Sequence, residues 1–121
     1  MEVSRLIAAP PSTLWALLAR PEHWPEWGPS VRAVECDDVE IRVGTHGRVR
    51  TAVGAWLPFT ITAVEAERGW DWQVAGLAAT GHRLDAVDDH HTRVAFTMPA
   101  WALPYAVVCK LALRNLARLA E

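Results

Sequence analysis

Between residues 31 and 98, apolar and polar side chains alternate with a period of two, and this pattern constrains the fold more than any other feature. Such alternation is typical of strands that are covered on one face only. We expect six strands, at residues 31–36, 47–53, 57–66, 70–74, 80–87 and 92–98. Short turns join these segments and no helical segment separates them, so an antiparallel meander is predicted rather than a parallel sheet.

The residues before this meander predict a strand followed by two short helices. Residues 3–8 form a short β-rich run, and a helix is expected to begin at Pro10 and Pro11 and to end before Pro21. A second helical turn, residues 21–24, is expected to be stopped by Pro25.

The chain closes with a predicted helix in the segment LPYAVVCKLALRNLARLAE. Lys110, Arg114 and Arg118 recur at four-residue spacing, so they are expected to form a solvent-facing stripe. The apolar residues of this helix are then expected to pack on the sheet: Leu103, Val107, Val108, Leu111, Leu116 and Leu119.

Three stretches carry a resemblance to a known superfamily. The opening VSRLIAAPPSTLWALLARPEHWPEWGPSVRAVE, and the hairpin formed by TGHRLDAV and HTRVAFTM, resemble the START-related polyketide cyclase/dehydrase and lipid-transport superfamily, SRPBCC. The turn DDHHT departs from it, because it lacks the glycine that the superfamily commonly carries there. The resemblance implies a helix-grip fold of the α+β class: a curved antiparallel sheet of six to seven strands wrapped around a long C-terminal helix. It spans nearly the whole chain, and 121 residues suit a single domain, residues 1–121.

The same resemblance implies a cavity between the sheet and the last helix. Trp24 would support the helix as a core residue, whereas Trp27 would either stand at the rim of the cavity or belong to the core. Strand parity also places these residues on the inward face: Val49, Val53, Leu57, Ala63, Val74 and Ala86. The expected lining of the cavity is apolar and aromatic: Trp27, Thr51, Phe59, Ile61, Trp70, Trp72, His82, Leu84, Phe96, Met98, Tyr105 and Val108.

Such a lining favours the binding of a small hydrophobic or aromatic molecule, such as a lipid or a polyketide. The alternative is a cofactor-independent cyclase, aromatase or dehydratase in which His82 acts as acid or base and Tyr105 donates a hydrogen bond. The competing interpretation of His82 is an inert imidazole bonded within the core. A third hypothesis is a protein-interaction module, which a contiguous exposed apolar patch would mark.

Composition excludes several other classes. A net charge of −2 and a pI near 6.2 argue against a nucleic-acid partner. The longest apolar stretch, residues 94–109, is broken by Pro99 and Pro104, so no membrane span is expected. Cys36 and Cys109 form no disulfide framework, which fits a cytoplasmic protein. No cofactor is expected, a metal site at His90 and His91 is disfavoured, and a homodimer through a sheet edge stays open.

Overall fold

The computed structural model describes the backbone of residues 1–121 and every side chain except those of Trp101 and Leu103, so the packing expected of Leu103 lies outside the described residues. Seven strands form one antiparallel sheet in the order β1-β7-β6-β5-β4-β3-β2. They are β1 (Glu2–Ile7), β2 (Val31–Cys36), β3 (His46–Thr51), β4 (Trp56–Glu65), β5 (Gly69–Val74), β6 (Leu77–Asp88) and β7 (His91–Thr97). The helical segments are α1 (Pro11–Ala19), η1 (Pro21–His23), α2 (Trp24–Trp27), η2 (Ala100–Tyr105) and α3 (Ala106–Ala120).

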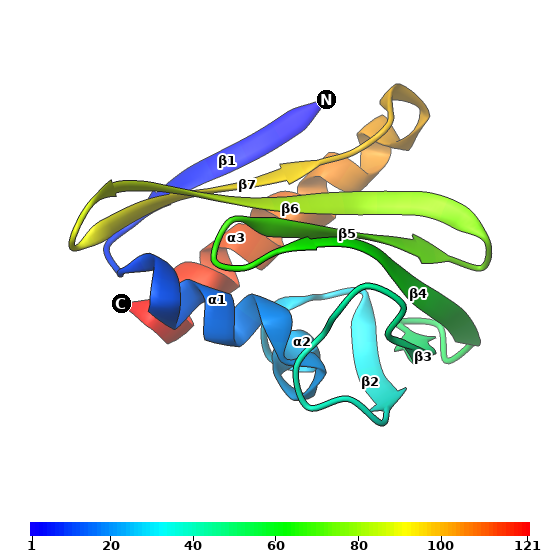
Figure 1. Ribbon diagram of the computed structural model, residues 1–121. Coiled ribbons are helices and arrows are strands. Elements are labelled where there is room, and N and C mark those ends of the chain that lie inside the picture. Colours follow the sequence, from blue (N-terminus) through cyan, green and yellow to red (C-terminus); the bar gives the residue numbers. More distant parts are fainter.

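The sheet curves around α3, as the helix-grip prediction requires (Figure 1). Helices α1 and α2 cover one end of this layer, while the β3–β4 turn, the β5–β6 turn and η2 lie at the other end. Shifts of register interrupt the β2–β3, β4–β5, β5–β6 and β6–β7 pairings. Because a bulge bends its strand and increases the local twist, these irregularities help the sheet to wrap around the helix.

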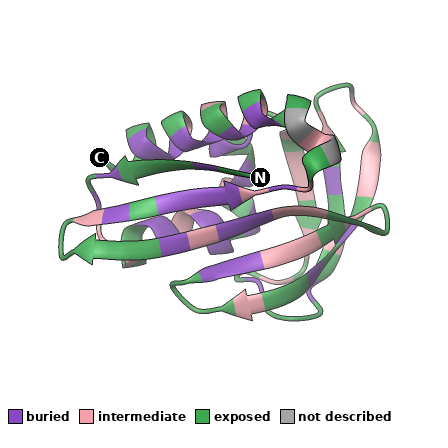
Figure 2. Cartoon of the chain, turned by 90° about the horizontal axis from the view of Figure 1, so that it is seen from above, coloured by how far each residue is buried: buried purple, intermediate pink, exposed green. Residues whose placement is uncertain are grey.

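Helix α3 presents its basic stripe to solvent, as predicted, and buries a face of mostly small side chains (Figure 2). The buried residues are Ala106, Cys109, Ala112, Leu113, Leu116 and Ala117. The predicted packing of Val107 and Leu119 is wrong, since these side chains are 64% and 46% exposed. Val107 lies three residues before Lys110, so the helical period places both on the same outer face.

The proline corner differs from its prediction at Pro25, which does not stop the second helical segment. Pro25 lies in the first turn of α2, and the helix continues to Trp27. A proline is tolerated there because its missing N–H would have no partner within the helix. This extension places Trp24 and Trp27 three residues apart on one short helix.

Three residues expected to face inward are exposed: Val53, Ala63 and Ala86. Strand β3 ends at Thr51, so Val53 belongs to a turn and is 92% exposed. A bulge between Ile61 and Ala63 reverses the parity of β4, so that Ala63 faces outward. Ala86 lies near the tip of the β6–β7 hairpin, which extends past α1 (Figure 1).

Candidate functional site

The two tryptophans of the proline corner hold the end of α1. The indole N–H of Trp24 donates to the carbonyl of Leu18, and that of Trp27 donates to the carbonyl of Leu17, each at 2.9 Å. The last carbonyls of a helix have no partner within it, so these indoles satisfy groups that would otherwise be left unpaired. The side-chain amide of Asn115 donates to the carbonyl of Trp27 at 3.1 Å, which ties the corner to α3.

Aromatic side chains fill the space between the corner and the sheet. Trp24 stacks on Trp70 at 5.2 Å between ring centroids, and Trp70 stacks on the imidazole of His82 at 3.9 Å. Phe59 meets Trp24 edge-on at 5.3 Å, and Phe96 meets His82 edge-on at 5.0 Å. Stacked and edge-on pairs of this kind add to the burial of apolar surface, so this end of the molecule is a solid core.

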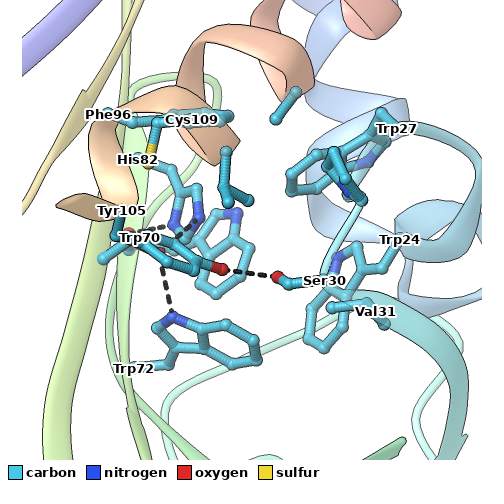
Figure 3. Close-up of a pocket in the computed structure, with 15 residues that line it drawn as sticks. Trp24, Trp27, Ser30, Val31, Trp70, Trp72, His82, Phe96, Tyr105 and Cys109 are labelled. Carbon is cyan, nitrogen blue, oxygen red and sulfur yellow. Dashed lines mark hydrogen bonds between the residues drawn. The ribbon is translucent and has the colours of Figure 1, made fainter. Parts of the chain in front are cut away.

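His82 takes part in a directed chain of hydrogen bonds (Figure 3). The carbonyl of Trp70 can only accept, so the imidazole Nδ1, 3.2 Å away, carries the proton. The indole N–H of Trp72 donates to Thr80 Oγ1 at 3.2 Å, and the Thr80 hydroxyl then donates to His82 Nε2 at 3.3 Å. Both ring nitrogens are therefore engaged within the protein.

The environment of His82 keeps its ring uncharged. Burial lowers the pKa of His82 from 6.5 to about 3, and this effect outweighs the bond to the Trp70 carbonyl, which acts in the opposite direction. The imidazole is neutral at physiological pH.

A small space of about 30 Å³ lies among these rings, beside the first half of α3. Its lining includes Trp27, Trp70, His82, Phe96 and Cys109. A space of this size accommodates about one water molecule, which is too little for an organic ligand. Burial also raises the pKa of the Cys109 thiol to about 11, so this sulfur is not a thiolate nucleophile at neutral pH.

A second and much larger cavity, of about 700 Å³, opens toward the other end of the sheet. Its described lining is mainly apolar: Ser30, Val31, Val49, Thr51, Ala52, Val53, Leu57, Trp72, Val74, Leu77, Ala78, Ala79, Thr80, Met98, Pro99, Ala102, Pro104, Tyr105 and Val108. The β3–β4 turn, the adjoining ends of β5 and β6, and η2 contribute residues to it. These segments lie at the end of the sheet opposite α1 (Figure 1).

Ser30 and Tyr105 lie at the junction of the two spaces, since both line each of them. Their hydroxyl oxygens are 2.5 Å apart, and they join the start of β2 to the start of α3 (Figure 3). Burial raises the pKa of Tyr105 above its usual value and outweighs the bond from Ser30, so the phenol stays protonated at neutral pH.

Two buried polar atoms lack a hydrogen-bond partner among the described side chains. They are Thr51 Oγ1 in the wall of the large cavity and Trp70 Nε1 in the wall of the small space. A buried hydroxyl or N–H group without a hydrogen-bond partner lowers the stability of the fold. Such groups therefore mark positions that are candidates for a functional role.

The residues expected from the sequence divide into three groups. Thr51, Trp72, Met98, Tyr105 and Val108 line the large cavity. Trp27, Trp70, His82 and Phe96 line only the small space, so Trp27 is a buried part of the aromatic core. Among the described side chains, Phe59, Ile61 and Leu84 contact neither space and belong to the core.

Several lining residues were not among those expected, above all Ser30. Its position next to Val31, which pairs with Thr51, brings it to the cavity wall. The sequence offered no indication of this, because the contact with Tyr105 joins positions 75 residues apart. Parity did place Val49, Leu57 and Val74 on the inner face, although it did not assign them to a cavity.

The described residues contain neither a metal-ligand cluster nor a membrane-spanning helix. In the part of the chain whose side chains are described, no three His, Cys, Asp or Glu residues gather as a metal site would require. His91 instead bonds to Asp88 within the hairpin tip. Across the described residues, no helix is long and apolar enough to cross a membrane.

Comparison with known proteins agrees with this architecture. Solved structures with the same fold include protein MLL2253 from Mesorhizobium loti, with a TM-score of 0.75, 20% identity, and coverage of 98% of this chain and 94% of that one. Another is XoxI from Bacillus cereus, with a TM-score of 0.76, 12% identity, and coverage of 99% and 94%. At these identities the likeness concerns the fold alone.

A search of curated proteins finds no match. The family described as polyketide cyclase/dehydrase and lipid transport, in contrast, matches residues 1–121, which is the whole chain. With the curved sheet, the gripped helix and the cavity between them, this match shows that the chain belongs to the polyketide cyclase/dehydrase and lipid transport family.

Proposed function

We propose that the protein binds a small hydrophobic molecule in the large cavity between α3 and strands β2 to β6. The observation that carries this proposal is a volume of about 700 Å³ lined almost entirely by apolar side chains. Ligand pockets in proteins commonly measure about 300–1,000 Å³. The family description, which includes lipid transport, supports the same reading.

The apolar wall gives the ligand both surface and orientation. Val49 and Leu57 face each other across β3 and β4, while Val108 approaches from α3. Trp72 offers the cavity an aromatic ring whose N–H is already bonded to Thr80. An aromatic or aliphatic guest can therefore pack on Trp72 without leaving a polar group unpaired.

The contacts of His82 favour a binding protein over a cyclase. A general acid or base needs access to the substrate and a pKa near the working pH. His82 lies outside the described lining of the large cavity, both its nitrogens are engaged, and its pKa is about 3. Its catalytic role stays a prediction, and so does that of Tyr105, which is the remaining titratable group among the described residues of the cavity wall.

The apolar residues on the surface give less support to the interaction-module hypothesis. The large exposed hydrophobic side chains are spread over several elements, for example Leu6 on β1, Val87 on β6 and Leu119 on α3. Scattered apolar residues of this kind are normal on a soluble protein surface. Val53, Leu77 and Tyr105 are exceptions, because all three also line the cavity, where Val53 and Leu77 extend its apolar wall.

The proposal is tested by blocking the cavity with a larger side chain. Val108→Trp places an indole into the cavity, whereas Val107→Trp makes the same change at the adjacent, 64% exposed position on α3. Binding of the neutral dye Nile red is followed by its fluorescence. We expect saturable binding to the wild type, a loss of affinity of about tenfold or more in Val108→Trp, and little change in Val107→Trp.

Two results would contradict the proposal. One is the absence of saturable binding to the wild-type protein, by Nile red or by any competing hydrophobic compound. The other is equal affinity of both variants for the dye, which would place the binding site elsewhere. Far-ultraviolet circular dichroism of the two variants checks that they share the wild-type fold.

A further inference from the structure

The cavity wall carries no charge that a ligand ion would need. Its described lining contains no Asp, Glu, Lys or Arg, and the smaller space adds only the uncharged His82. Burial of an ionised group is strongly unfavourable unless an opposite charge or several hydrogen bonds meet it. A guest enclosed here is therefore expected to be uncharged wherever it contacts the wall.

The same wall carries an accessible polar point where Ser30 and Tyr105 meet. Each hydroxyl has one proton, and their mutual hydrogen bond uses only one of the two. The second proton remains available for an acceptor from the ligand, and both oxygens retain lone pairs. Tyr105 is 37% exposed and lines the cavity, so a guest can reach this pair without a rearrangement of the core.

Thr51 adds a further hydroxyl to this side of the cavity. It pairs with Val31 across β2 and β3, one residue from Ser30, and its Oγ1 has no partner among the described side chains. The hydroxyls of Ser30, Thr51 and Tyr105 thus lie near the β2–β3 edge of the sheet, whereas that of Thr80 lies on β6 and is engaged with Trp72 and His82.

We propose that the ligand is an uncharged hydrophobic molecule whose carbonyl or hydroxyl oxygen hydrogen-bonds to the Ser30–Tyr105 pair. The inference rests on the proposed binding function and names the ligand's chemical class and a specificity-determining residue, Tyr105. The wall then distinguishes ketones, esters and alcohols from hydrocarbons by one hydrogen bond, and from carboxylates by the desolvation of their charge.

The test uses three probes of nearly the same shape: acetylnaphthalene, ethylnaphthalene and naphthoate. Each competes with Nile red for the wild type, for the double variant Ser30→Ala/Tyr105→Phe and for Thr60→Val, a control that removes a hydroxyl from an exposed position on β4. In the wild type we expect acetylnaphthalene to bind about twofold to tenfold more tightly than ethylnaphthalene, and naphthoate to bind more weakly than either.

The double variant Ser30→Ala/Tyr105→Phe removes both hydroxyls of the pair, so it is expected to abolish the preference for acetylnaphthalene while leaving the affinity for ethylnaphthalene within about twofold. A merely structural role of the Ser30–Tyr105 contact would weaken both probes equally. Thr60→Val is expected to keep the wild-type preference.

Three outcomes overturn this inference while Nile red still binds: equal affinity of the wild type for ketone and hydrocarbon, a preference that survives in Ser30→Ala/Tyr105→Phe, or naphthoate as the tightest probe. Absence of saturable dye binding is a different result, because it removes the proposed function itself.

Discussion

His82 shows how strongly the fold constrains a residue whose type suggests catalysis in the sequence. Its imidazole lies between Trp70 and Phe96 and joins a chain of hydrogen bonds from Trp72 through Thr80 to the Trp70 carbonyl. This chain satisfies every participating donor and acceptor only when the ring is neutral and protonated at Nδ1. The protonation state of one side chain is thereby coupled to the packing of the aromatic core.

The low pKa of His82 predicts a loss of stability in mild acid. Because its pKa is lower in the folded state than the value of 6.5 for the free side chain, the unfolded chain binds more protons as the pH falls below about 6.5. The contribution of the neutral ring is complete above that pH and declines toward the folded-state pKa of about 3. From about pH 7 to about pH 5, the free energy of unfolding should fall by about 2 kcal/mol through this residue alone.

Urea unfolding of the wild type and of His82→Asn at both pH values measures this contribution, since the variant keeps an N–H donor but does not titrate. The wild type should lose about 2 kcal/mol more than the variant. Equal losses would mean that the imidazole becomes charged without unfolding the core. If His82→Asn does not fold, nitrogen NMR of the wild type should show an uncharged Nδ1–H ring at about pH 5.

At the scale of the elements, two connections hold the strands and helices at their angles. At the proline corner, α1 ends on three bonds from outside the helix: Trp27 and Trp24 donate to Leu17 and Leu18, and the Ile41 backbone donates to Ala19 at 2.9 Å. At the far end, Ala75 and Gly76 form the two-residue turn between β5 and β6. Both turn residues have positive φ angles, 53° and 79°, as a type I′ hairpin requires.

Ala75→Asn is expected to stabilise the protein, because asparagine adopts positive φ more readily than alanine and Asn-Gly is the preferred type I′ sequence. The free energy of unfolding should rise by about 0.5–1 kcal/mol, measured as a higher urea midpoint with an unchanged slope. Ala86→Asn, at an exposed position within β6, is the control and should give no gain. A lower midpoint for Ala75→Asn would show that the turn does not limit stability.

The order of the elements was predictable from the sequence, while the bulges in the strands and the contacts between distant residues were not. Alternation located all six strands from β2 to β7, since this signal is local. The bulge after Ile61 carries no sequence mark and reverses the parity of the following residues, so Ala63 was misplaced and Val64 was missed. The Ser30–Tyr105 pair and the indole bonds to α1 depend on contacts between distant residues, which a period cannot reveal.

At the scale of the whole molecule, the fold divides its interior into a filled end and a hollow end. The filled end contains the stacked rings of Trp24, Trp70 and His82, and the hollow end is lined by residues of the β3–β4 turn, the adjoining ends of β5 and β6, and η2. Protein cores gain stability from close contact between side chains. The filled end can therefore supply the rigidity of the fold, while the hollow end lacks these packing contacts. A cavity of about 700 Å³ is therefore a feature maintained at the expense of stability.

Occupation of this cavity should stabilise the whole molecule. A ligand that binds only the folded state raises the free energy of unfolding by about 2.7 kcal/mol at a concentration of about 100 times its Kd. Acetylnaphthalene at saturating concentration should therefore raise the Tm of the wild type by several degrees and that of Val108→Trp much less. An equal rise in both proteins would indicate binding outside the cavity.

The two chain ends lie at opposite ends of this asymmetric interior. The N-terminal ammonium of Met1 donates to the carbonyl of Met98, a residue of the cavity wall, whereas Glu121 accepts a bond from the backbone of Ala8 at the filled end. A purification tag or fluorescent reporter fused before Met1 would thus emerge beside the entrance and obstruct or mimic an incoming guest. The same fusion after Glu121 would leave that entrance clear, so a purification tag or reporter is better attached at the C-terminal end.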